Sequence, residues 1–148
     1  MTAVMNDLAT ALHTLCDALA VPLPPPTAAA QYELRLDQAV LRLARHGETH
    51  AVLEAEVLAL GAAAGLAGTA QQDLLRHLLA CNLARLKGQA RPEILSYDER
   101  ENRLVLWRRW PCDARLAAAV LDGAEGLLNE LDFWRDQVAT LLPKGAHL

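Results

Sequence analysis

Aromatic side chains make up only 4% of this 148-residue chain, which also holds just 3 Cys and 2 Lys. The cysteines, Cys16, Cys81 and Cys112, lie far apart and form no Cys-x-x-Cys motif, so they predict neither a disulfide framework nor a zinc cluster. Free cysteines of this kind are typical of a reducing cytosol. Because 18 acidic residues outnumber 14 basic ones and the net charge is −4, we expect no nucleic-acid partner.

Long apolar runs are also missing. Charged or polar residues interrupt every leucine-rich stretch, so we expect no membrane insertion. Residues 1–7 contain no basic residue, and we expect no secretory signal. The chain is nevertheless 53% hydrophobic, with a mean hydropathy of +0.10. In a small acidic protein this value indicates apolar surface that a partner covers.

Three segments repeat apolar residues every three or four positions, which predicts amphipathic helices. These helices are expected at residues 6–20, 69–88 and 113–142. Pro22 ends the first helix. The second helix is predicted to open with a capping box formed by Thr69 and Gln72, and the third with Asp113 as its N-cap.

Five segments alternate apolar and polar residues or form short apolar runs, which predicts strands. They lie at residues 32–36, 41–44, 52–60, 93–97 and 103–110. Polar turns of hairpin length separate the first three, so an antiparallel meander is expected, and the last two form a hairpin. The last strand is apolar on both faces, with Leu104 and Leu106 on one and Val105 and Trp107 on the other. We expect it to be covered on both sides.

The order of these elements is α-β-β-β-α-β-β-α, which predicts an α+β fold with an antiparallel sheet flanked by three helices. A chain of this length is expected to form one domain over residues 1–148. Its connections are predicted to be a proline-rich segment at 22–31, a flexible linker at 61–69 and a frayed tail at 143–148.

Residues with catalytic chemistry do not gather in the predicted fold. His46 and His50 have the i, i+4 spacing of helical metal ligands, but their segment is predicted as a hairpin loop, where this spacing does not bring the imidazoles together. The carboxylates of Glu54 and Glu56 are expected on a solvated strand face. We predict no catalytic site, no metal and no cofactor. A small metal-dependent hydrolase using His46, His50 and Glu54 is the enzymatic alternative.

The apolar stripes exceed what one core of this size needs to bury, which favours a protein that binds other chains. Three segments, in their order and spacing, resemble the Tir-chaperone (CesT-like) family, the class I chaperones of bacterial type III secretion. The segments are Leu78–Asn82 on the second helix, Arg103–Pro111 on the hairpin, and Leu131–Arg135 on the last helix.

The resemblance implies a cytoplasmic bacterial homodimer that is not an enzyme. It implies binding of the N-terminal segment of a secreted effector in extended form, which stays soluble and secretion-competent and is directed to the export apparatus, with the secretion ATPase as a candidate partner. A dimeric peptide-binding adaptor or regulator of the same fold outside secretion is the alternative. The implied effector-binding residues are Leu8, Leu12, Leu15, Tyr32, Leu34 and Leu36. The implied dimer-interface residues are Leu74, Leu75, Leu78, Leu79, Leu83, Leu104 and Leu106.

Overall fold

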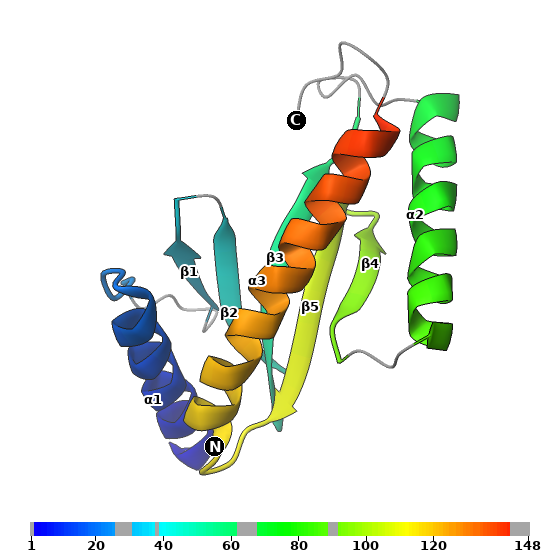
Figure 1. The fold of residues 1–148 in the computed structure, drawn as a ribbon. Helices are drawn as coiled ribbons and strands as arrows, with labels where there is room; N and C mark the ends of the chain where they lie inside the picture. Colours follow the sequence, from blue (N-terminus) through cyan, green and yellow to red (C-terminus); the bar gives the residue numbers. More distant parts are fainter. Residues whose placement is uncertain (1, 26–30, 38, 62–67, 89–91, 143–148) are drawn as a thin grey trace.

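Five strands form one antiparallel sheet in the order β1-β2-β3-β5-β4, with three helices beside it (Figure 1). The computed structural model describes residues 2–25, 31–37, 39–61, 68–88 and 92–142, with side chains from residue 7 onward. The strands are β1 (Gln31–Arg35), β2 (Val40–His46), β3 (His50–Ala59), β4 (Ile94–Asp98) and β5 (Arg103–Pro111). The helices are α1 (Thr2–Leu19), α2 (Thr69–Gly88) and α3 (Leu116–Leu141). The predicted element order is confirmed.

The first three strands form the predicted meander, and β5 lies between β3 and β4. Leu34 pairs with Leu41, which pairs with Ala55, and Ala55 pairs with Leu106, so these apolar side chains share one face of the sheet. The pairing of β3 with β5 shifts between Glu56 and Leu58. The guanidinium of Arg135 donates to the carbonyl oxygen of Glu56 at 3.1 Å, so α3 supplies a donor at this irregularity.

The helix α3 crosses β3 and β5, and α1 packs against α3 (Figure 1). The contact with β5 depends on Gly123, where an added Cβ would overlap the indole of Trp110. Glycine therefore lets α3 approach the sheet closely. Leu104 and Leu106 are buried on this side of β5, and Trp134 is buried in α3. The opposite face of β5 carries Val105 and Trp107.

The end of α1 is fixed by a residue in the left-handed region. Ala20 has a φ of 56°, and the amide of Val21 donates to the carbonyl of Cys16 at 3.1 Å. Pro22 follows, as is common after such a helix end. The predicted proline-rich connection is described only to residue 25, and the linker residues 62–67 and the tail 143–148 lie outside the described residues.

The start of α3 corrects one prediction. Asp113 is not the N-cap: the helix begins at Leu116, and Arg115 occupies the N-cap position without a side-chain cap. The carboxylate of Asp113 instead accepts the amide of Arg115 at 2.9 Å, in a turn that precedes the helix. An aspartate favours such local turns as well as N-caps, and the sequence does not distinguish the two. The capping box of Thr69 with Gln72 stays a prediction, although α2 begins at Thr69.

Candidate protein-binding surfaces

Two faces of α2 differ in what they touch. Leu74 and Leu78 are buried against the body of the protein. Leu79, Leu83 and Leu86 are 48%, 56% and 44% exposed and recur at i, i+4 and i+7. We call these three residues the α2 stripe. A helix with exposed leucines at this spacing presents a surface that fits another apolar surface.

The C-terminal half of α2 is held to α3 by a charged side chain. The guanidinium of Arg85 bonds the carboxylate of Glu130 at 2.6 Å and lies 3.5 Å from the ring centroid of Phe133. Glu130 is only 7% exposed, so removing either partner would leave a charge without its counterion in a poorly solvated place. The ion pair joins α2 to α3, and the α2 stripe stays exposed. Helical periodicity does not predict this pair, and its one sign in the sequence is that Glu130 interrupts the apolar series Leu127, Leu131 and Trp134 on α3.

The outer edge of β1 offers backbone groups to a partner strand. Beyond the end of β1, the amide of Leu36 donates to the carbonyl of Ala39 at 2.8 Å, which closes the hairpin to β2. Because hydrogen-bonded and non-hydrogen-bonded pairs alternate in an antiparallel ladder, the amides of Glu33 and Arg35 point away from β2. Edge groups of this kind are the template for adding a further strand.

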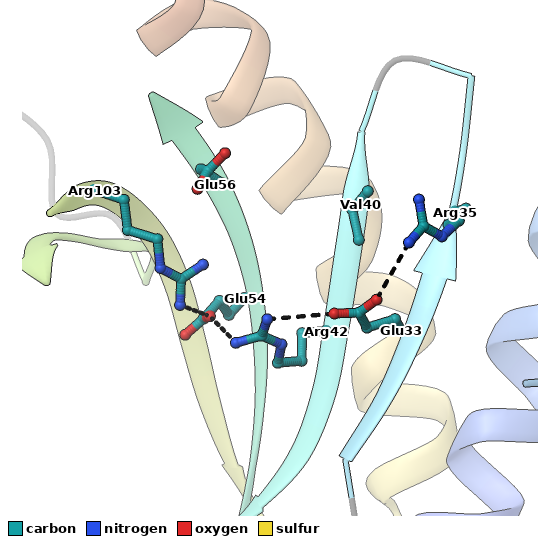
Figure 2. Close-up of a pocket in the computed structure, with 7 residues that line it drawn as sticks. All are labelled: Glu33, Arg35, Val40, Arg42, Glu54, Glu56 and Arg103. Carbon is teal, nitrogen blue, oxygen red and sulfur yellow. Dashed lines mark hydrogen bonds and ion pairs between the residues drawn. The ribbon is translucent and has the colours of Figure 1, made fainter. Parts of the chain in front are cut away.

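The face of the sheet opposite α3 is crossed by a chain of ion pairs, which is shown in Figure 2. The carboxylate of Glu54 accepts hydrogen bonds from the guanidinium groups of Arg103 at 2.7 Å and Arg42 at 3.4 Å. Arg42 also donates to the carboxylate of Glu33 at 3.3 Å. These side chains line a pocket of about 200 Å³. A second contact joins Arg103 to Asp98 at 3.2 Å, so the chain of charges extends from β1 to β4. The charges make this face polar, unlike the α2 stripe.

The Arg103 cluster shifts the pKa values of two of its members, Arg103 and Asp98. Partial removal from water lowers the pKa of Arg103, but the hydrogen bond and charge of Glu54 outweigh it, and the net pKa is raised. The pKa of Asp98 is lowered: partial desolvation raises it, and the hydrogen bonds from Arg103 and from backbone amides more than compensate. Both groups stay charged at neutral pH.

His46 and His50, which were predicted to lie apart, are neighbours on adjacent strands. His46 lies directly opposite His50 in the register of β2 with β3, which corrects the expectation that their spacing keeps them apart. Glu54 is four residues further along β3, roughly 13 Å away, and is already bonded to two guanidinium groups. Within the described residues no three potential ligands gather at one point. The hydrolase alternative therefore gains no site from the geometry.

Burial also raises the pKa of two cysteine thiols. The pKa of Cys16 is raised by burial and by the nearby charge of Asp17. The pKa of Cys112 is raised by burial and by the charges of Asp7 and Asp113. A raised pKa disfavours the thiolate, the nucleophilic form of cysteine. The two thiols therefore pack as small hydrophobic groups.

The predicted partner-binding residues fall into two sets. Those buried within the protomer cannot touch a partner directly in this conformation: Leu8, Leu12, Leu15, Leu34, Leu74, Leu78, Leu104 and Leu106. Those with accessible surface are Tyr32, Leu36, Leu75, Leu79 and Leu83. The accessible set lies in two places, beside the β1 edge and on α2. Leu86, which is not among the predicted interface residues, completes the stripe on α2.

None of the helices in the described part of the chain is both long and apolar enough to cross a membrane. No protein-family model matches the sequence, and no curated protein matches it either. Likeness to solved structures, in contrast, extends over nearly the whole chain.

The fold is that of the bacterial type III secretion chaperones. One similar chain belongs to the HopA1–SchA chaperone–effector complex, with a TM-score of 0.61 and 17% identity over 92% of this chain and 97% of that one. Another belongs to the ExoT–SpcS complex of Pseudomonas aeruginosa, with a TM-score of 0.55 and 20% identity over 85% and 96%. A third belongs to the Yersinia pestis complex of the type III secretion chaperone SycH with a fragment of YscM2, with a TM-score of 0.52 and 16% identity over 91% and 99%.

Proposed function

We propose that this protein is a homodimeric chaperone of the bacterial cytoplasm that binds the N-terminal segment of a secreted effector in extended form. It keeps that segment soluble and secretion-competent and directs it to the export apparatus, with the secretion ATPase as a candidate partner and without enzymatic activity of its own. The observation that carries the proposal is the likeness to a chaperone–effector complex over 92% of the chain, together with the two accessible surfaces.

The α2 stripe supports a dimer. Each of Leu79, Leu83 and Leu86 is about half exposed, and burying the remaining surface stabilises an interface by about 1 kcal/mol per leucine. A twofold dimer uses the same patch on both copies, so the contribution doubles. The four buried leucines of the predicted interface then act as the packing beneath it. We therefore propose that the interface uses the stripe and the half-buried Leu75.

The β1 edge supports client binding. The strands β1 and β4 are the two outer strands, and α2 contacts the turn before β5 through a hydrogen bond of 3.0 Å between Gln71 and Asn102. A dimer formed through α2 therefore leaves β1 at the far side of the sheet. A client strand added there gains backbone hydrogen bonds, and its side chains meet Tyr32 and Leu36 on one side and Glu33 and Arg35 on the other.

A proline placed on the β1 edge tests the proposal. Arg35→Pro removes an amide that points outward and leaves the β1–β2 hydrogen bonds in place, whereas Arg35→Ala removes only the side chain. Each variant is co-expressed with the first hundred or so residues of the protein encoded beside it, and the complex is purified. We expect Arg35→Ala to retain the client and Arg35→Pro to lose most of it, with both variants showing the circular dichroism of the parent. Equal retention by the two variants would contradict client binding at this edge.

A further inference from the structure

The helices α1 and α3 form an open groove of about 560 Å³ that neither surface described above includes. Its floor is apolar: Leu19 from α1 and Leu121 and Leu128 from α3 have accessible surface, whereas Leu15 and Ala124, which also line it, are buried. The rim on the α3 side carries the carboxylates of Asp122 and Glu125, both on exposed residues. A floor of leucines with an acidic margin is a specific combination, because it favours a partner with apolar and basic groups side by side.

The acidic rim belongs to a larger charge asymmetry. The helix α3 carries five carboxylates and a single basic residue, Arg135, which gives −4, equal to the net charge of the whole chain. The helix α1 adds two carboxylates and contains no Lys or Arg. The two helices that form the groove therefore carry −6, and the rest of the chain carries +2. Such a field attracts a basic segment and repels an acidic one.

The shape of the groove selects the form of the partner. It lies between two helices, not along a sheet edge, so an incoming backbone finds no row of amides and carbonyls to pair with. A partner must therefore satisfy its own backbone hydrogen bonds, which an α-helix does. The part of α3 that lines the groove, Ala118–Asn129, is about 17 Å long, which matches roughly three turns of a docked helix.

We infer that this groove binds a basic amphipathic helix of the client, whose leucine-type side chains enter the floor and whose lysines or arginines face Asp122 and Glu125. This inference rests on the proposed chaperone function and adds a second contact to the extended strand at β1. It assigns the client a sequence pattern, apolar residues at i, i+3 or i+4 and i+7 beside basic residues. That pattern is separate from the segment that pairs with the sheet.

Two designed peptides of 18 residues serve as the probe. They share leucines at helical spacing, and the remaining positions are mostly lysine in one and glutamate in the other. Fluorescence anisotropy at physiological salt measures their binding to the intact protein. We expect the lysine peptide to bind at least tenfold more tightly than the glutamate peptide, and its affinity to fall as salt is raised. Equal binding of the two peptides, or no binding of the lysine peptide, overturns the inference.

Charge-reversal variants localise the contact. The double variant Asp122→Arg, Glu125→Arg is expected to weaken binding of the lysine peptide on the order of tenfold, because two charge attractions become repulsions. The matched control is Asp132→Arg with Asp136→Arg, which makes the same charge change on exposed positions of α3 outside the groove. The control is expected to bind within about twofold of the parent. An equal loss in both double variants would show general charge attraction and overturn the groove assignment.

A second matched pair tests the apolar floor. Leu121 is 38% exposed and lines the groove, whereas Leu141 is 39% exposed at the far end of the same helix. Leu121→Gln is expected to weaken binding of the lysine peptide several-fold, and Leu141→Gln is expected to leave its binding unchanged. Unchanged binding by both variants overturns the assignment. Co-purification of the client with the Arg35→Ala variant distinguishes this inference from the proposed function. If the client is captured but the lysine peptide does not bind the groove, only this inference is refuted.

Discussion

Ala20 holds a backbone conformation that its side chain disfavours. Its φ of 56° lies in the left-handed region, where a Cβ costs about 1–2 kcal/mol, and where glycine is usual at the end of a helix. Ala20→Gly removes this strain and adds some freedom to the unfolded chain. We therefore expect the free energy of unfolding to rise by about 0.5–1 kcal/mol in urea denaturation at a fixed protein concentration.

The same substitution inside α1 acts in the opposite direction. Ala9 is exposed in the interior of the helix, and Ala9→Gly is expected to lower the free energy of unfolding by about 0.5–1 kcal/mol. A stability loss of equal size in both variants would show that the conformation of Ala20 is not the cause.

Neighbouring leucines show where sequence reasoning stops at the residue scale. Leu78 is fully buried and Leu79 is 48% exposed, although both belong to the same apolar pattern on α2. A core leucine and an interface leucine have the same chemistry, so the pattern does not tell which one faces inward. The ion pair of Arg85 with Glu130 joins α2 to α3 through residues 45 positions apart. A contact over such a distance is not visible in local periodicity.

At the scale of elements, local patterns were sufficient for the order and approximate bounds of all helices and strands. The alternation of Tyr32, Leu34 and Leu36 identified β1, and the period of α3 identified its length. The errors fell at residues that favour two local structures equally, such as Asp113, which can cap a helix or form a turn before it. The pairing of β3 with β5, and with it the close approach of Gly123 to Trp110, depends on tertiary packing that periodicity does not encode.

The helix α2 yields the prediction at this scale. Leu79→Glu places a charge on an exposed position, so the protomer should fold while the dimer is lost. We expect light scattering after gel filtration to give twice the chain mass of 16.1 kDa for the parent and 16.1 kDa for the variant. Leu23→Glu is the matched control, because Leu23 is also 48% exposed but lies outside α2, and it should remain dimeric. A dimeric Leu79→Glu variant would move the interface to another surface.

At the scale of the whole molecule, three kinds of surface lie in different places. The α2 stripe is apolar, the sheet face opposite α3 is covered by ion pairs, and the groove of α1 and α3 is acidic with an apolar floor. The β1 edge lies at the opposite end of the sheet from β4. The leucines of the sequence are thereby divided between a core and separate accessible surfaces, as the proposed binding of a second copy and of a client requires.

Hydrogen–deuterium exchange of the protein purified with its proposed client tests the central claim most directly. The amides of Glu33 and Arg35 point away from β2, so they should exchange quickly in the free protein and become protected when a client strand pairs with β1. We predict protection of β1 in the complex, together with protection of one short client segment. Unchanged exchange in β1 in a stable complex would contradict the account.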